Sequence, residues 1–306
     1  MKIMVFDVGG TEIKYSVMDE QMHRTNSGAV PTPQDTQAQF LDAVYRLYAP
    51  HKDEVSGIAM ALPGFVDNRT GYVSNGGALL YNTATPVGQL LAEKCGCPVI
   101  LENDGKAAAM AELANGALKD CCNAAVFIIG TGVGGGIIAN GQLVRGVHFT
   151  AGEYSFVNTN AEAWDAPDQN MACQCSTSNL LKWYRARKAL PEDAPLDGRS
   201  FFAAANAGEP EALEVLRRFC HAVAVQIYNL TVLLDVEKVA IGGGISKQPL
   251  LLESLRSAYD GLYASRAGQA YMEGLPRCQI VPCAFSSEAN QVGVAAAYFE
   301  AMQKNC

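Results

Sequence analysis

The sequence is short of charge, and of positive charge in particular. Charged residues make up 18% of the 306 residues, and 23 lysines and arginines are outnumbered by 31 aspartates and glutamates, which gives a net charge of −8. A surface of this sign repels a polyphosphate backbone unless a local basic patch compensates for it. The sequence contains no such patch, so its composition argues against a nucleic-acid partner.

Long hydrophobic runs are also missing. No stretch approaches the roughly 18 consecutive apolar residues of a membrane-spanning helix, and the N-terminus reaches Asp7 without the apolar core of a secretory signal. We therefore expect a cytoplasmic protein with no membrane partner. In a reducing cytosol, most of its ten cysteines should be thiols rather than parts of disulfides.

The sequence has enough apolar residues to form a large hydrophobic core. Hydrophobic residues make up 49% of the chain, whose length allows about two domains. Strand-like and helical segments alternate in two halves, and each half opens with a strand, a glycine cluster and a hairpin. This pattern predicts an α/β protein with two lobes, the smaller formed by residues 1–113 plus 288–306 and the larger by residues 114–287.

The first hairpin carries a glycine-rich turn with the sequence Asp7-Val8-Gly9-Gly10-Thr11-Glu12-Ile13-Lys14. Glycines in such a turn let backbone N–H groups approach an anion closely. Asp7 could hold a metal ion there, and Thr11 and Lys14 could contact a phosphate. An ordinary glycine turn is the alternative interpretation.

The second hairpin begins with the run Gly130-Thr131-Gly132-Val133-Gly134-Gly135-Gly136. Its glycines match the dinucleotide-binding fingerprint formally, but that fingerprint needs a helix after them. A strand-like segment and an Asn140-Gly141 turn follow instead, which predicts a hairpin and excludes a Rossmann site. A third cluster, Gly242-Gly243-Gly244, follows a later strand-like segment.

Six motifs in register resemble those of the ROK family of sugar kinases and repressors, which belongs to the hexokinase and actin-like ATPase superfamily. They are Asp7-x-Gly-Gly-Thr-x-x-Lys14, Leu62-Pro63-Gly64-Phe65-Val66-Asp67, Glu102-Asn103-Asp104, Gly130-Thr131-Gly132-x-Gly134-Gly135-Gly136, Gly152-Glu153 and Gly242-Gly243-Gly244-Ile245-Ser246. The resemblance covers nearly the whole chain. It implies a two-lobed actin-like ATPase (ribonuclease H-like) fold with an active-site cleft between the lobes, ATP and Mg²⁺ as cofactors, and a homodimer.

The resemblance also implies a role for each matched residue. Asp104 would be the general base that takes a proton from a sugar hydroxyl, and Asn103 and Glu153 would bind the sugar. Gly64 and the loop of Gly77 and Ala78 would flank the same site. Asp7 would hold Mg²⁺, and the ATP-binding residues would be Gly9, Gly10, Thr11, Lys14, Gly130, Thr131, Gly132, Gly134, Gly243 and Gly244. A helix N-cap pair at Asn103-Asp104 and a solvated surface glutamate at Glu153 are the alternatives.

The sequence departs from the family at its structural zinc site, for which most members supply one histidine and three cysteines. Cys173 and Cys175 match two of these ligands, but Phe156 and Leu180 occupy the other two positions. Neither apolar side chain can coordinate zinc, which needs four nitrogen, sulfur or oxygen ligands in a structural site. His148 could substitute in principle, although an ordinary surface histidine is the simpler interpretation. We therefore expect no zinc.

The same departure bears on specificity, because the family histidine also contacts the sugar near its anomeric end. Phe156 would offer an apolar stacking surface that could accept a second ring. A zinc-less branch of the family, the β-glucoside kinases, has segments similar to residues 152–156 and 76–78. We therefore expect an ATP-dependent kinase for the 6-hydroxyl of a glucosyl unit in cellobiose-type β-glucosides. Alternatively, Phe156 fills space left by the lost zinc.

Other functions remain as alternatives. The chain could be a glucokinase or an N-acylhexosamine kinase acting, for example, on N-acetylmannosamine, and a catalytically inactive sugar sensor is an alternative of another class. Repressors of the family carry a winged helix-turn-helix before the first motif, which begins here at Asp7. A filament-forming ATPase would fit the superfamily but not the sugar-site motifs.

Overall fold

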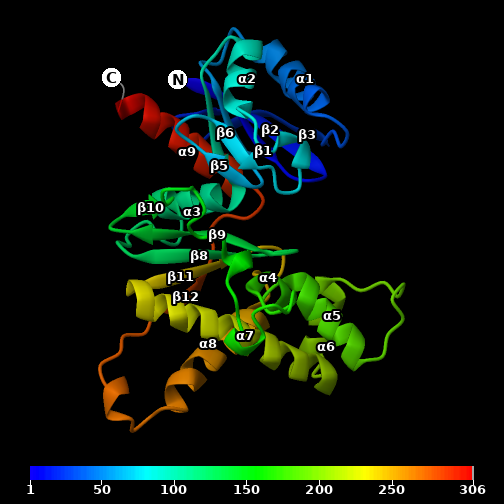
Figure 1. Ribbon diagram of the computed structural model, residues 1–306, viewed down its shortest axis with the longest axis vertical. Coiled ribbons are helices and arrows are strands. Elements are labelled where there is room, and N and C mark those ends of the chain that lie inside the picture. The colour runs from blue at the N-terminus through cyan, green and yellow to red at the C-terminus, as the bar shows by residue number, and fades with distance from the viewer. Residues whose placement is uncertain (305–306) are drawn as a thin grey trace. The chain divides into compact units, whose positions relative to one another are not determined.

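The computed structural model describes residues 1–304, which form two compact units (Figure 1). The first unit comprises Met1–Gly116, Leu143–Ala151 and the chain from Ser287 onward, and the second comprises Ala117–Gln142 and Gly152–Ser286. The segment Leu143–Ala151 thus lies in the first unit, whereas the sequence-based boundaries assigned it to the larger lobe. Two side-chain contacts join this segment to the rest of the first unit: Arg145 pairs with Glu102, and Arg69 lies 4.7 Å from the ring centre of Phe149.

The first unit is built on a five-stranded sheet in the order β3-β2-β1-β4-β7. Its strands are β1 (Lys2–Val8), β2 (Glu12–Asp19), β3 (Arg24–Pro31), β4 (Ile58–Leu62) and β7 (Val99–Asn103). β1 pairs antiparallel with β2, as the predicted hairpin requires, and parallel with β4. Six consecutive residues of β1 are buried, which is typical of a central strand covered on both faces.

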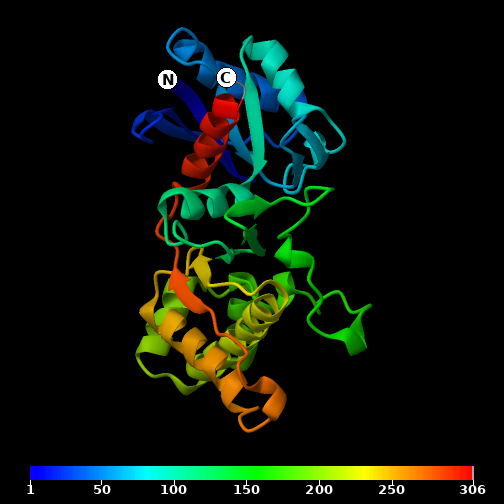
Figure 2. The same ribbon diagram turned by 90° about the vertical axis from the view of Figure 1, so that its left-hand side faces the viewer.

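Helices and a small second sheet complete this unit. The helices are α1 (Gln37–Tyr48), α2 (Val87–Cys95), α3 (Asp104–Asn115) and α9 (Ala289–Lys304), with the 3-10 turns η1 (Ala49–His51) and η2 (Leu80–Asn82). The small sheet pairs β5 (Phe65–Asp67) with β6 (Tyr72–Asn75). α9, drawn in red in Figure 2, packs against α3 and against β1 and β4.

The crossing of α3 and α9 is unusually close. A Cβ atom placed on Gly293 of α9 would lie 1.7 Å from the carbonyl oxygen of Ala107 in α3. No side chain can be accommodated at that distance, so glycine is required for the two helix backbones to touch. This contact fixes α9 relative to the first turn of α3.

The second unit contains the strands β9, β8, β11 and β12 of a second five-stranded sheet, whose full order is β10-β9-β8-β11-β12. The strands are β8 (Ala124–Ile129), β9 (Val133–Ala139), β10 (Gln142–Val144), β11 (Lys238–Gly242) and β12 (Gln279–Pro282). β8 and β9 form the second predicted hairpin, and both residues of the Asn140-Gly141 turn have positive φ, as a type I′ turn requires.

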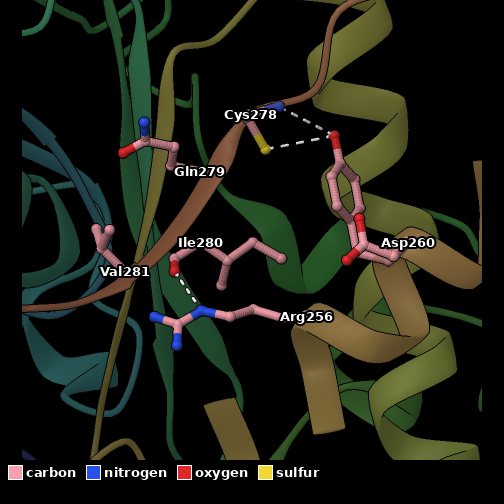
Figure 3. Close-up of a pocket in the computed structure, with 7 residues that line it drawn as sticks. Arg256, Asp260, Cys278, Gln279, Ile280 and Val281 are labelled. Carbon is pink, nitrogen blue, oxygen red and sulfur yellow. Dashed lines mark hydrogen bonds between the residues drawn. The ribbon is translucent and has the colours of Figure 1, made fainter. Parts of the chain in front are cut away.

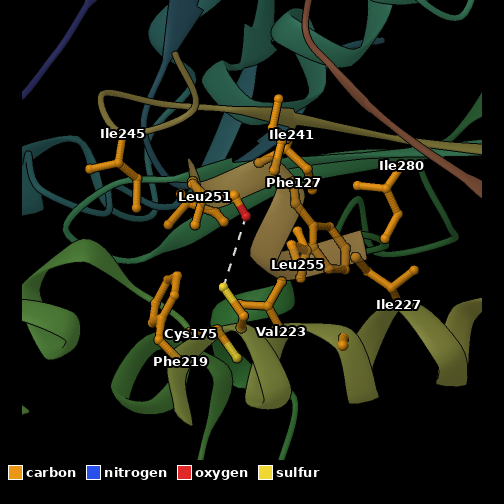
Figure 4. Close-up of a cluster of buried hydrophobic side chains, with 14 of the residues drawn as sticks. Phe127, Cys175, Phe219, Val223, Ile227, Ile241, Ile245, Leu251, Leu255 and Ile280 are labelled. Carbon is orange, nitrogen blue, oxygen red and sulfur yellow. Dashed lines mark hydrogen bonds between the residues drawn. The ribbon is translucent and has the colours of Figure 1, made fainter. Parts of the chain in front are cut away.

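The helices of the second unit enclose one large apolar core. They are α4 (Met171–Gln174), α5 (Thr177–Arg187), α6 (Gly198–Asn206), α7 (Pro210–Leu234) and α8 (Pro249–Ala264), with the 3-10 turns η3 (Tyr154–Phe156), η4 (Ala161–Ala163) and η5 (Ala270–Met272). Phe219, Val223 and Ile227 of α7 pack towards Phe127 and Ile241 of the sheet (Figure 4). Leu and Ile side chains of α8 and β12 complete this cluster.

The outer edge of this sheet is protected. β12 ends at Pro282, which has no N–H to offer, and Nε of Arg256 in α8 donates to the carbonyl oxygen of Ile280 at 2.9 Å (Figure 3). A hollow of about 360 Å³ lies between α8 and β12, and Tyr259 and Asp260 contribute to its lining. Arg256, which also lines the hollow, therefore has a structural role as a hydrogen-bond donor to the edge strand.

Two further features concern the whole described chain. The cysteines within residues 1–304, nine in all, are free, and Cys306 lies outside the described residues. None of the helices described in this structure is both long enough and apolar enough to span a bilayer.

Candidate active site

The site residues singled out in the sequence fall into two groups, one in each unit. The first unit contains Asp7, Gly9, Gly10, Thr11, Lys14, Gly64, Gly77, Ala78, Asn103 and Asp104. The second unit contains Gly130, Thr131, Gly132, Gly134, Glu153, Phe156, Gly243 and Gly244.

Asp7 lies in β1, just before the strand ends at the glycine turn. Asp7 and Lys14 face each other across the hairpin, with Lys14 Nζ 3.9 Å from Asp7 Oδ2. Oδ1 of Asp7 accepts a hydrogen bond of 2.9 Å from Nδ2 of Asn290. Burial raises the pKa of the Asp7 carboxyl, whereas the Asn290 hydrogen bond and the charge of Lys14 act in the opposite direction.

Two side chains from the loop between β3 and α1 hold the turn in shape. Thr32 Oγ1 donates to the carbonyl oxygen of Gly9 at 2.8 Å, and Gln34 Nε2 donates to that of Gly10, also at 2.8 Å. Because both carbonyl oxygens are occupied, the turn is preorganised rather than loose. Thr11 remains exposed at its tip.

The junction of β7 and α3 positions Asp104. β7 ends at Asn103, whose Oδ1 caps the helix by accepting from the Lys106 N–H at 3.0 Å. Nδ2 of Asn103 donates to the carbonyl oxygen of Gly64 at 2.9 Å. Asp104 is half-buried in the first turn of α3, and its Oδ1 accepts from the Gly105 N–H at 2.8 Å. The helix cap considered as an alternative is therefore present, and it orients the proposed base.

A buried ion pair behind Asp104 was missed by the sequence reasoning. Glu102 is fully buried, and its Oε1 accepts from the backbone N–H of Asn103 at 3.0 Å. Its Oε2 lies 2.8 Å from both Nε and Nη2 of Arg145. Arg145 belongs to no motif and lies 43 residues further along the chain. No local signal could have identified it as the partner of Glu102.

The loop after β6 lies beside the Gly64 turn and the glycine turn of the first hairpin. The Gly77 N–H donates to Oδ1 of Asn75 at 2.8 Å, and a Cβ on Gly77 would lie 2.9 Å from the nitrogen of Gly64. A Cβ on Gly10 would lie 3.1 Å from that of Ala78. The structure therefore brings the glycine turn, the Gly64 turn and this loop together within the first unit.

In the second unit, the Gly130–Gly132 turn lies at the N-terminus of α5. The Thr177 N–H donates to the carbonyl oxygen of Gly130 at 2.9 Å, and Ser155 Oγ accepts from the Val133 N–H at 3.0 Å. Helix N-termini favour anions, because their free N–H groups carry partial positive charge. Sequence reasoning missed Thr177 because nothing in the glycine pattern shows that the turn contacts the start of a helix more than 40 residues further along the chain.

Gly243 is packed against the same turn. Its φ is +96°, and a Cβ there would lie 2.1 Å from the carbonyl oxygen of Ile129. Glycine is therefore required by both conformation and space. Gly243 and the neighbouring Gly244 thus lie close to the β8 end of the Gly130–Gly132 turn.

Glu153 and Phe156 flank η3, which is anchored on β9. The hydroxyl of Tyr154 donates to the carbonyl oxygen of Gly136 at 3.0 Å, and the Tyr154 ring packs edge-on against Phe127 at 4.5 Å. Phe156, two residues later, is 71% exposed. An aromatic side chain at that exposure fills no void, so the space-filling alternative does not account for it.

The family's zinc-site positions differ in burial in this structure. Cys175 is 1% exposed and Leu180 is fully buried, both in the core of the second unit, whereas Phe156 points to solvent. Burial raises the pKa of the Cys175 thiol to about 12, which disfavours the thiolate that zinc needs. No group of three or more His, Cys, Asp or Glu side chains in residues 1–304 is placed to hold a metal ion.

The absence of zinc stays a prediction, and metal analysis of the purified protein tests it. We expect no stoichiometric zinc, and we expect Cys173→Ser to leave the melting temperature unchanged, because the hydrogen bond of this thiol to the carbonyl oxygen of Pro167 is long, at 3.7 Å. Stoichiometric zinc that disappears in Cys173→Ser would contradict the prediction.

Residues 3–303 match the ROK family. The chain belongs to the ROK family. It is 31% identical to a β-glucoside kinase of Listeria innocua, over 84% of this chain and 87% of that protein. The family resemblance drawn from the six motifs is confirmed.

Solved structures of ROK proteins have the same fold. A ROK family protein from Streptococcus pneumoniae in complex with sucrose superposes with a TM-score of 0.87 at 28% identity, covering 99% of this chain and 100% of that one. A ROK family glucokinase from Streptomyces griseus in complex with glucose and AMPPNP gives 0.79 at 25% identity, covering 97% and 99%. The predicted α/β fold of the actin-like ATPase class is confirmed.

Proposed function

We propose that this ROK protein is an ATP-dependent sugar kinase that phosphorylates the 6-hydroxyl of a glucosyl unit, and that β-glucosides of the cellobiose type are its preferred substrates. The kinase class is supported by family membership together with an intact set of phosphate and sugar motifs. The observation that carries the glucoside specificity is the exposed ring of Phe156, held next to Glu153 by η3. Glucose alone has no second ring for such a face to contact.

The proposed chemistry assigns the base to Asp104. A carboxylate within hydrogen-bond reach of the attacking hydroxyl accelerates transfer by about 10²- to 10⁴-fold. The Gly105 amide fixes Oδ1 of Asp104, and the Asn103 cap fixes the start of its helix. Asn103 and Glu153 would bind sugar hydroxyls, and the remaining acceleration comes from positioning and from neutralising charge on the phosphates.

Nucleotide binding is assigned to the glycine turns. The Gly9–Thr11 turn and Lys14 would face the phosphates, as would the Gly130–Gly132 turn at the N-terminus of α5, while Gly243 and Gly244 would lie against the adenosine. Mg²⁺ in kinase sites is held by one or two carboxylates together with the substrate phosphates. Asp7 offers one such carboxylate, whose Oδ2 lies 3.9 Å from Lys14 Nζ. When bound, Mg²⁺ would neutralise charge on the phosphates.

The proposal includes a cytoplasmic location and a homodimer, with neither nucleic acid nor membrane as partner. Free cysteines suit a reducing compartment, and a net charge of −8 disfavours nucleic acid. Sedimentation analysis of the purified protein tests the dimer.

A substrate panel with MgATP tests the function. We expect kcat/KM to be higher for cellobiose and aryl β-glucosides than for glucose or N-acetylmannosamine, with the phosphate on the 6-oxygen of the non-reducing glucose. A clear preference for glucose or N-acetylmannosamine would overturn the glucoside assignment. Absence of sugar-dependent ATP turnover would overturn the kinase itself.

Phe156→Ala should lower kcat/KM for β-glucosides by about 2- to 10-fold, the equivalent of 0.5–1.5 kcal/mol for one aromatic contact. The value for glucose should stay unchanged, because glucose has no second ring to stack. Phe156→Tyr is the matched control, since it keeps the ring and should keep the selectivity. An equal loss of kcat/KM for β-glucosides and for glucose would show that the ring does not contact the second ring of the substrate.

A further inference from the structure

We propose that Asn290 is a positioning residue for Asp7, holding one carboxylate oxygen so that the other is presented to the metal ion of the nucleotide. The inference rests on the proposed function, in which Asp7 is the Mg²⁺ ligand. Asn290 lies 283 residues from Asp7 in sequence and belongs to none of the six motifs.

The two carboxylate oxygens of Asp7 have different neighbours. Oδ1 accepts from Nδ2 of Asn290 at 2.9 Å, whereas the nearest cation to Oδ2, Lys14 Nζ, stays at 3.9 Å. Asp7 is only 8% exposed, so its carboxylate has little water to orient it. A neutral amide on Oδ1 fixes the plane of the carboxylate without adding a positive charge, which would compete with a divalent cation. Partners of this kind orient metal ligands and tune their affinity.

The position of Asn290 is set by the packing of α9. Asn290 lies in the first turn of α9, and one turn later Gly293 touches the backbone of Ala107 in α3. Ala107 in turn lies one turn after Asp104. The same helix crossing therefore fixes both the proposed base and the residue that orients the proposed metal ligand.

A neighbouring contact offers a matched control. Gln291, the next residue of α9, accepts a hydrogen bond of 3.3 Å from Ser16 Oγ in β2. Both amides therefore tie α9 to the same hairpin, but only Asn290 touches Asp7. If Asn290 merely attached the helix, removing the Ser16 bond should have the same consequences as removing Asn290.

The experiment measures Mn²⁺ binding to the full-length protein in the presence of ADP by electron paramagnetic resonance, and kcat and KM in parallel. Asn290→Ala should weaken Mn²⁺ binding or lower kcat by about 10- to 100-fold, as other partners of metal ligands do. KM for the sugar should be unchanged. Asn290→Leu, which keeps the shape but not the amide, should behave like Asn290→Ala, and Asn290→Gln should recover part of the loss.

Ser16→Ala should retain wild-type Mn²⁺ affinity and kcat. Wild-type metal affinity and kcat in Asn290→Ala, or equal losses in Asn290→Ala and Ser16→Ala, would overturn the proposal. Mn²⁺ and ADP bind without sugar, so a wild-type protein that fails to phosphorylate any sugar would overturn the proposed function while leaving the metal comparison readable.

Discussion

Asp104→Asn should reduce kcat with cellobiose by about 10²- to 10⁴-fold, the range that a general base contributes. Asparagine keeps an oxygen that can accept from the Gly105 N–H, so the start of α3 should be undisturbed. The variant should therefore melt at the wild-type temperature and bind nucleotide normally. Steady-state kinetics and thermal unfolding together check this expectation.

Asp120→Asn serves as the control for a change of charge alone. Asp120 is exposed in a turn of the second unit and belongs to no proposed site, so its replacement should leave kcat unchanged. Full ATP-dependent turnover by Asp104→Asn would remove Asp104 from the role of base. A loss of kcat accompanied by a large drop in melting temperature would point to a structural role instead.

Arg145→Met should lower the free energy of unfolding by about 3–5 kcal/mol, because it leaves a buried carboxylate without its partner. Glu102 is fully buried, and Arg145 donates to its Oε2 through Nε. The loss should be visible in chemical denaturation followed by circular dichroism. Activity should fall as well, since Glu102 also holds the backbone N–H of Asn103.

Two variants make this prediction specific. Arg187→Met breaks an ion pair of similar length, 2.9 Å, but both of its side chains are about half exposed, so it should cost at most about 1 kcal/mol. Glu102→Gln combined with Arg145→Met removes the buried charge along with its partner and should recover much of the stability. Equal losses in Arg145→Met and Arg187→Met would refute the argument from burial.

Much of the local structure around the candidate site could be predicted from sequence because its signals are local. The Asn140-Gly141 turn, the two glycine hairpins and the strand-to-helix junction at Asn103-Asp104 each depend on residues a few positions apart. The backbone conformation that such residues require can be derived from the residues themselves.

The partners of these residues could not be predicted, because they come from distant parts of the chain. Arg145 reaches Glu102, and Asn290 reaches Asp7, across long separations in sequence and without any motif. The same holds for Leu143–Ala151, whose place in the first unit follows from contacts with distant parts of the chain and not from its own pattern. The burial of a single polar group and the identity of its partner depend on the folded chain, so a local sequence pattern does not predict them.

The discontinuity of the first unit has a consequence for folding during synthesis. Its sheet is translated early, but α9, which packs on β1, β4 and α3, is translated only after the whole second unit. At about 5–20 residues per second, the sheet waits on the order of ten seconds for that helix. We expect the second unit, started later, to be completed first, and the early sheet to depend on chaperones in the interval.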